Sequence, residues 1–357
     1  MKTTITILAA FFVMLNVTHA TVLTVSNDPV GGAQFGSMLA AYNAAVNGDT
    51  LLFEGTNINY TMASCNAGWN KSLTVIGIGF NPQKQSPRRT LFAQSDNCCC
   101  GEFVIHGSGS GSSFYGITFV SGVRVRSATS NLTFEDCSFD GGNPNFNIEN
   151  VTASNFTWRN CVFNGNSISN INFSNGSTTN SNMLVSNCVF DGYIEGQNSP
   201  FITLLVDHCL FLGANTFSQL HFAIIQNSIF MNVFPAGVTN SAFTNNMCRV
   251  AGTFPPVGGG GNSAAGNIEA TNPNFVTYTN GAFYSTGHNY HVQSGSPAIG
   301  AATDATEIGL HGGLTHFSES GEVLINPIMR TLHILNSTIA PNGTLNVNIN
   351  ATKPTDN

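Results

Sequence analysis

The chain repeats one short phrase along its middle third. Four copies read NLTFEDCSFDG at 131–141, NFTWRNCVFNG at 155–165, NMLVSNCVFDG at 182–192 and TLLVDHCLFLG at 203–213, and looser copies lie at 222–232 and 238–243. Units of this length are typical of stacked repeats, in which each unit contacts only its neighbours. The repetition therefore predicts a solenoid rather than a conventional compact core.

Within each copy the pattern predicts two short strands joined by a bend. In the second copy, inward positions alternate as far as Trp158, the alternation breaks at Asn160, and it resumes at Cys161 and Phe163. Asparagine suits such a bend because it tolerates the left-handed backbone conformation. The successive corner positions are Asp136, Asn160, Asn187, His208, Asn227 and Asn240.

Two further positions recur and are predicted to point inward as stacks. The small apolar position holds Cys137, Cys161, Cys188 and Cys209. The large position holds Phe139, Phe163, Phe190, Phe211, Phe230 and Phe243, with Phe119 as an earlier member. Subtraction of these numbers gives spacings that fit one coil, except that the 13 residues from Phe230 to Phe243 are too few.

These features resemble the pectin-lyase-like superfamily in its secreted bacterial form. The resemblance is carried by the Asn corner, the Cys and Phe positions, the phrase GDTLLF at 48–53 and the segment GSPAIGAATDATEIGLHGG at 295–313. It implies an all-β fold, a right-handed parallel β-helix over residues 21–313. Function stays open, because the superfamily mixes lyases, hydrolases and adhesins.

An open solenoid needs a cover at each end. Phe35, Leu39, Tyr42 and Val46 recur at helical steps and predict an N-terminal capping helix over 33–47, stopped by Gly48. Residues 326–350 predict two or three strands with a turn at 341–343, in an irregular C-terminal β segment over 314–357.

The composition restricts location and partners. Residues 1–20 have the basic start, apolar run and small-residue end of a secretory signal, which predicts a secreted or cell-surface protein. No later apolar stretch is long enough for a transmembrane helix. A net charge of −7 with 11 Lys plus Arg argues against nucleic acid. We expect a monomer.

The remaining cysteines permit a disulfide in an exported chain. Cys65, the run 98–100 (Cys98, Cys99 and Cys100) and Cys248 lie outside the predicted stack. A bridge from Cys65 to the run is one arrangement, and sequence alone leaves the pairing open.

Catalytic groups, if present, are expected on the outward positions of strands near 146–151, 168–173 and 193–196. By resemblance, lyases use acids that hold calcium together with a Lys or Arg base, and hydrolases use two or three carboxylates. Glu149 and Glu195 are the only acids there, and we expect no Arg or Lys beside them. Asp191 is a third candidate, although turn aspartates commonly bond their own backbone.

Other candidates concern carbohydrate and metals. Trp69 and Tyr60 are the predicted carbohydrate platform. His288, His291, His311 and His316 show no ligand spacing of a known class, so no metal site is assigned. No cofactor is expected, with calcium kept as an optional ligand.

The sequence favours a non-catalytic scaffold whose polar, Asn-rich face binds glycans or extracellular matrix. The alternative is a polysaccharide lyase or glycoside hydrolase with its site on the β-helix face. Convergence of Glu149, Glu195 or the turn aspartates with a cation or a base would favour the enzyme. An ice-binding role ranks last, since the repeats lack a regular outward threonine position.

Overall fold

We describe the protein from a computed structural model. It covers residues 20–29, 32–56, 58–62, 68–81, 88–94, 101–149, 151–165, 168–174, 180–197, 202–258, 260–319, 321, 328–334 and 347–352. Most of residues 1–20, Cys65 and Cys98 to Cys100 lie outside this set, so the signal and the disulfide remain predictions. None of the described helices has the length and apolar character needed to cross a bilayer.

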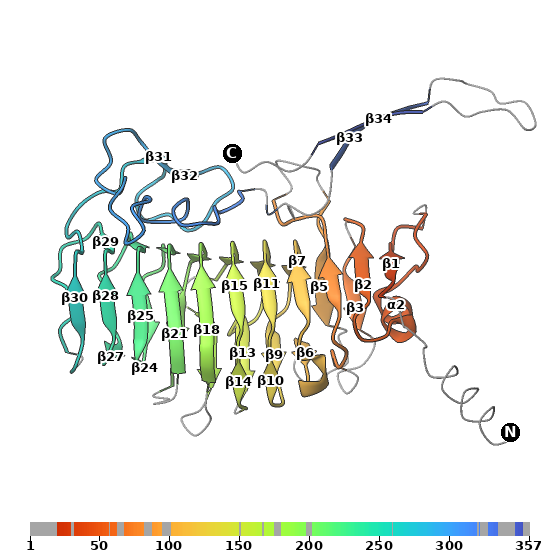
Figure 1. Cartoon of the computed structure of the whole chain (residues 1–357), viewed down its shortest axis with the longest axis horizontal. Coiled ribbons are helices and arrows are strands. Elements are labelled where there is room, and N and C mark those ends of the chain that lie inside the picture. The colour runs from red at the N-terminus through yellow and green to blue at the C-terminus, as the bar shows by residue number, and fades with distance from the viewer. Residues whose placement is uncertain are drawn as a thin grey trace, which may run out of the picture.

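Three parallel sheets form the solenoid, two of them extending from its first coils to its last and the third covering the coils between. Figure 1 shows the strands of successive coils stacked side by side. Sheet 1 has the order β1 (Val22–Val25), β2 (Thr50–Phe53), β4 (Thr74–Ile76), β7 (Ser113–Tyr115), β11 (Thr133–Glu135), β15 (Thr157–Arg159), β18 (Asn180–Ser186), β21 (Ile202–Asp207), β25 (Ala223–Gln226), β28 (Ala242–Thr244) and β30 (Ser263–Ala265), with β10 (Thr129–Ser130) and β14 (Ala153–Ser154) beside it. Sheet 2 contains β3 (Tyr60–Met62), β5 (Leu91–Gln94), β8 (Thr118–Phe119), β12 (Ser138–Phe139), β16 (Val162–Phe163), β19 (Val189–Phe190), β22 (Leu210–Phe211), β26 (Ile229–Phe230) and β29 (Met247–Cys248). Sheet 3 contains β6 (Phe103–Ile105), β9 (Val123–Val125), β13 (Phe146–Glu149), β17 (Ser169–Ser174), β20 (Tyr193–Glu195) and β23 (Phe217–Ser218).

The shorter elements lie around these sheets. They are the helix α2 (Met38–Ala44), the 3-10 turn η1 (Gly107–Gly109), the parallel pair β24 (Leu220–His221) and β27 (Val238–Thr239), and the antiparallel pairs β31 (Phe275–Thr277) with β32 (Asn289–Val292) and β33 (Ile328–Ile334) with β34 (Val347–Thr352). The predicted fold class, an all-β parallel β-helix, is confirmed. The expected turn at 341–343 lies outside the described residues.

The core is built from the two predicted stacks. Strand register places Phe119, Phe139, Phe163, Phe190, Phe211 and Phe230 one above another in sheet 2. The rings from Phe139 to Phe230 stack face to face, with centroids 4.6–5.0 Å apart. The four repeat cysteines are fully buried free thiols, and burial raises the pKa of Cys137, Cys161 and Cys188 well above the usual value. They act as small packing groups.

The last predicted repeat was assigned to the wrong column. Phe243 pairs with Ile225 in sheet 1, and Cys248 continues the Phe column by pairing with Phe230 in sheet 2. The corner of this coil is Asn245, with φ 50°, while Asn240 belongs to another corner. The 13-residue spacing arose because two different columns were compared.

The corner asparagines also hold the end of the chain. Asn160, Asn187 and Asn227 have φ of 51–53°, the left-handed conformation that the pattern predicts. The side-chain amide of Asn187 donates to the carbonyls of Leu310 and Gly312, both at 2.9 Å. Asn227 likewise exchanges hydrogen bonds with Thr303. The corner asparagines therefore hold the later part of the chain against the solenoid by hydrogen bonds.

We call residues 271–319, the segment bound by these corner asparagines, the cover. It turns back after the last coil and runs along the solenoid (Figure 1). Its Phe275, Tyr290, Ile308 and Phe317 form a second core with the outward side chains of sheet 2. Those outward side chains are Val162, Val189, Leu210, Ile229 and Met247.

Replacing Asn187 by alanine should lower the free energy of unfolding by about 2 kcal/mol, because the buried Gly312 carbonyl loses its amide donor and the Leu310 carbonyl keeps only the N–H of Phe317. Asn155 is a matched comparison, since it has φ 58° but lies at an exposed corner. Chemical denaturation of Asn155→Ala should give a loss of about 1 kcal/mol or less. Equal losses of unfolding free energy at the two sites would show that the hydrogen bonds from Asn187 to Leu310 and Gly312 do not stabilise the protein.

The N-terminal helix is shorter and turned relative to the prediction. Ser37 caps α2, and the Ser37 side chain accepts a hydrogen bond from the N–H of Ala40. The buried stripe of the helix contains Met38, Ala41 and Tyr42. Val46 is exposed at 53%. Of the predicted stripe only Tyr42 is buried on the helix: Phe35 precedes the helix in a bridge to Val25, Leu39 is partly exposed, and the chain leaves the helix at Ala45 before Val46 can turn inward.

Candidate functional site

The outer face of sheet 3 carries a column of polar side chains. The strands alternate, so Phe146, Ile148 and their partners fill the core while the residues between them face outward. Register aligns the outward residues of successive coils at the same height. In order along the solenoid they are Arg124, Asn147, Asn172, Glu195 and Ser218.

An ionic network occupies one end of this face. Arg124 contacts Glu102 through Nε and, at 2.8 Å, through Nη2, and its Nη1 lies 2.8 Å from Glu149 Oε1. Arg126 Nε donates to the other oxygen of Glu149 at 3.3 Å. Side-chain exposure is 19% for Arg124 and 8% for Glu102. Two guanidinium groups and two carboxylates thus form a half-buried network in which the charges balance.

The expectation that no Arg or Lys accompanies the acids was wrong. Arg124 and Arg126 lie one coil before Glu149, at sequence separations of 25 and 23 residues. Their signal was the phrase VRVR at 123–126, in which two inward valines alternate with two outward arginines. It was missed because this coil precedes the first clear copy of the repeat.

Between Arg124 and Glu195 the outward column holds two uncharged side chains, Asn147 and Asn172. The Asn172 amide donates to Glu195 Oε2 at 3.2 Å. Burial raises the pKa of Tyr193 above its ordinary value, and the nearby charge of Glu195 raises it further. The column combines guanidinium, amide and carboxylate groups, and the phenol of Tyr193 belongs to the neighbouring column, opposite Ser169.

The third acidic candidate lies elsewhere. Asp191 is buried beneath the cover, where its Oδ1 accepts from the backbone N–H of Tyr284 at 2.7 Å. Burial raises its pKa to about 7. Asp191 therefore does not share the solvent-facing surface of Glu149 and Glu195.

The predicted carbohydrate platform was wrong. Trp69 and Tyr60 are 0% and 1% exposed. Trp69 packs against Tyr42 of the capping helix, and its indole N–H donates to Ser112 Oγ at 3.0 Å. Both rings close the first coils of the solenoid, because an end without further strands is filled by large side chains.

The carboxylates of the Arg–Glu network on the outer face of sheet 3 are poorly placed to bind calcium. Calcium takes six to eight oxygen ligands, whereas Glu102 and Glu149 already bind guanidinium groups. Among the described residues, three metal-ligating side chains with donor atoms within 4.8 Å of one another occur at His291, His311 and Glu319. Calcium binding stays a prediction without a site.

The molecule is thus a parallel β-helix with an Arg–Glu network and a polar column on one sheet. No family model matches the sequence. No curated protein matches it either. Among solved structures it is similar to the pectate lyase Pel9A, with a TM-score of 0.46, 14% identity, and coverage of 82% of this chain and 96% of that chain. It is also similar to QnrB1, described as a plasmid-mediated fluoroquinolone resistance protein, with a TM-score of 0.34, 13% identity, and coverage of 60% and 91%.

Proposed function

We propose that the protein is an exported β-helix scaffold that binds polysaccharide along the outer face of sheet 3 without cleaving it. This proposal rests on the continuous row of outward polar side chains from the Arg124 network through Asn172 to Glu195. The four strands from Arg124 to Glu195 are separated by three spacings of about 4.8 Å, so this row is about 14 Å long. A row of this length fits a linear polymer rather than a compact small molecule.

The chemistry of the row suits sugar hydroxyl and carboxyl groups. Arginine presents planar donors that bind carboxylates in pairs, and amides both donate and accept. Glu102 and Glu149 hold the Arg124 guanidinium in one orientation, so less side-chain entropy is lost on binding. A network whose charges balance binds by hydrogen bonds rather than by net attraction.

The same contacts weigh against catalysis. A hydrolase needs one carboxylic acid that can donate its proton, and a lyase needs a base that can take one. Both oxygens of Glu149 accept from guanidinium groups, and Arg124 donates through three nitrogens to two carboxylates. Groups paired with one another in this way are less available to donate or accept a proton, which supports binding over cleavage.

The first experiment is a panel of acidic and neutral polysaccharides, with and without calcium. Binding is read by pull-down, and cleavage by reducing ends and by absorbance of unsaturated products. We expect binding without product. The double variant Asn172→Ala/Glu195→Gln should bind at least about tenfold more weakly, because it removes two adjacent polar groups.

Asn155→Ala is the matched control, since it removes an exposed amide from a corner outside this face. It should bind as the natural protein does. Turnover that is lost on replacing Glu149 or Glu195 would establish the lyase or hydrolase alternative instead. Equal binding by the double variant and the control would place the glycan surface elsewhere.

A further inference from the structure

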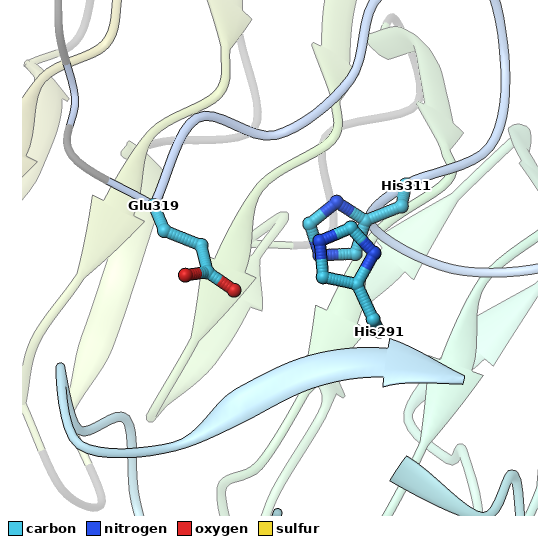
Figure 2. A group of neighbouring side chains, drawn as sticks. All are labelled: His291, His311 and Glu319. Atoms are coloured by element: carbon cyan, nitrogen blue, oxygen red, sulfur yellow. The ribbon is translucent and has the colours of Figure 1, made fainter. Parts of the chain in front are cut away.

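Three metal-ligating side chains meet in the cover, far along the chain from sheet 3. His291 lies on β32, and His311 lies in the loop that is hydrogen-bonded to the corner residue Asn187. Glu319 lies at the end of the cover. Their donor atoms all lie within 4.8 Å of one another. Figure 2 shows the two imidazole rings face to face, with the Glu319 carboxylate extending toward them.

The backbone of each of these residues is fixed by a hydrogen bond. The N–H of His291 donates to Asn289 Oδ1 at 3.0 Å, and the carbonyl of Glu319 accepts from Asn81 at 2.6 Å. The carbonyl of His311 lies 2.7 Å from His316 Nδ1. Such contacts hold the three backbone segments in place.

The spacing is compatible with a small tetrahedral cation. Ligand bonds of about 2.0–2.2 Å place tetrahedral donors roughly 3.4 Å apart. The ring centroids of His291 and His311 are 3.5 Å apart and the rings are inclined by 14°. The donor atoms, which lie within 4.8 Å of one another, would have to approach by up to about 1.4 Å to reach this tetrahedral spacing. The stacked rings would also have to turn, because an imidazole nitrogen binds an ion in the plane of its ring.

The environment favours capture of an ion from solvent. His311 is 7% exposed, while His291 and Glu319 are partly exposed. One side of the group is therefore shielded and the other is accessible. A shielded imidazole pair beside a carboxylate is the donor set of zinc sites with two histidines and one glutamate.

We propose that His291, His311 and Glu319 bind one divalent transition-metal ion of the zinc type. Two imidazoles and one carboxylate suit such ions better than calcium, which prefers oxygen ligands alone. Three protein ligands leave a fourth position for water. The ion joins segments that are 20 and 8 residues apart by subtraction, and so fastens the cover to itself.

The test uses the full mature protein after chelator treatment, with Zn²⁺ and Co²⁺ as probes. Calorimetry should detect one tight Zn²⁺ site per chain, Co²⁺ should give the visible absorption of tetrahedral coordination, and Zn²⁺ should raise the melting temperature. His291→Ala and Glu319→Gln should each weaken Zn²⁺ binding by about 100-fold and abolish the cobalt band. Both residues are only partly buried, so these variants should fold, which circular dichroism checks.

His221→Ala is the control, because this histidine lies on β24, outside the cover. It should retain the site. Absence of tight Zn²⁺ binding to the natural protein overturns the proposal. So does binding of equal strength in His291→Ala, Glu319→Gln and His221→Ala, which would indicate histidine binding without a defined site. Glycan binding by sheet 3 is read separately and does not depend on this result.

Discussion

Replacing Phe163 by alanine should lower the free energy of unfolding by about 3–5 kcal/mol, the range for removing a buried aromatic side chain. Phe163 is fully buried in the middle of the Phe column. Its ring stacks on Phe139 at 4.6 Å and on Phe190 at 4.8 Å, with interplanar angles of 4° and 5°. The variant removes contacts with the coil on each side, so both neighbours lose packing.

Phe222 supplies the control, since its side chain is 48% exposed. Phe222→Ala should cost about 1 kcal/mol or less. Urea or thermal unfolding of both variants gives the comparison. A Phe163→Ala protein as stable as the natural one would mean that the ring is not packed inside the solenoid.

Replacing Asp191 by asparagine should stabilise the protein at alkaline pH and have little effect near pH 4. Burial raises the pKa of Asp191 to about 7 in the folded state, against about 3.9 in an unfolded chain. The folded state therefore binds the proton more tightly, so this group stabilises the fold fully below about pH 4 and that contribution is lost as the pH rises through about 7. The difference of pKa corresponds to about 4 kcal/mol at pH 8.

Asparagine keeps the acceptor for the Tyr284 N–H but has no charge to desolvate. Unfolding free energies measured from pH 4 to pH 8 should show the advantage of Asp191→Asn growing across this range. Glu54→Gln, at a side chain that is 47% exposed, should follow the natural protein throughout. An advantage for Asp191→Asn that did not change with pH would contradict a raised pKa.

Much of the solenoid could be predicted because a repeat fold is encoded locally. Each coil places the same kinds of residue at the same positions, so Phe163 and Cys161 could be identified without long-range information. Asn160 and Asn187 were predictable for a related reason, since their left-handed φ is a property of one residue. The prediction was wrong at Phe243, which belongs to sheet 1, because the Phe column continues with Cys248 instead of another phenylalanine.

The candidate site was only half predictable. The strands that carry Glu149 and Glu195 were located from the pattern, whereas their arginine and amide partners belong to neighbouring coils. Trp69 was misplaced because an aromatic residue in an irregular stretch reads as exposed until the end of the solenoid is seen. Chemistry that depends on contacts between coils needs the register between them.

The sequence by itself determined the coil: its inward stacks, its corners and its parallel β-helix class, because these repeat at short range. Only the tertiary structure decided what lies on the coil. The cover packs on sheet 2, which explains why outward residues such as Val189 and Leu210 are apolar, and it buries Asp191. It also brings His291, His311 and Glu319 together. No local pattern contains these contacts, since they join one non-repeating segment to itself and to many coils at once.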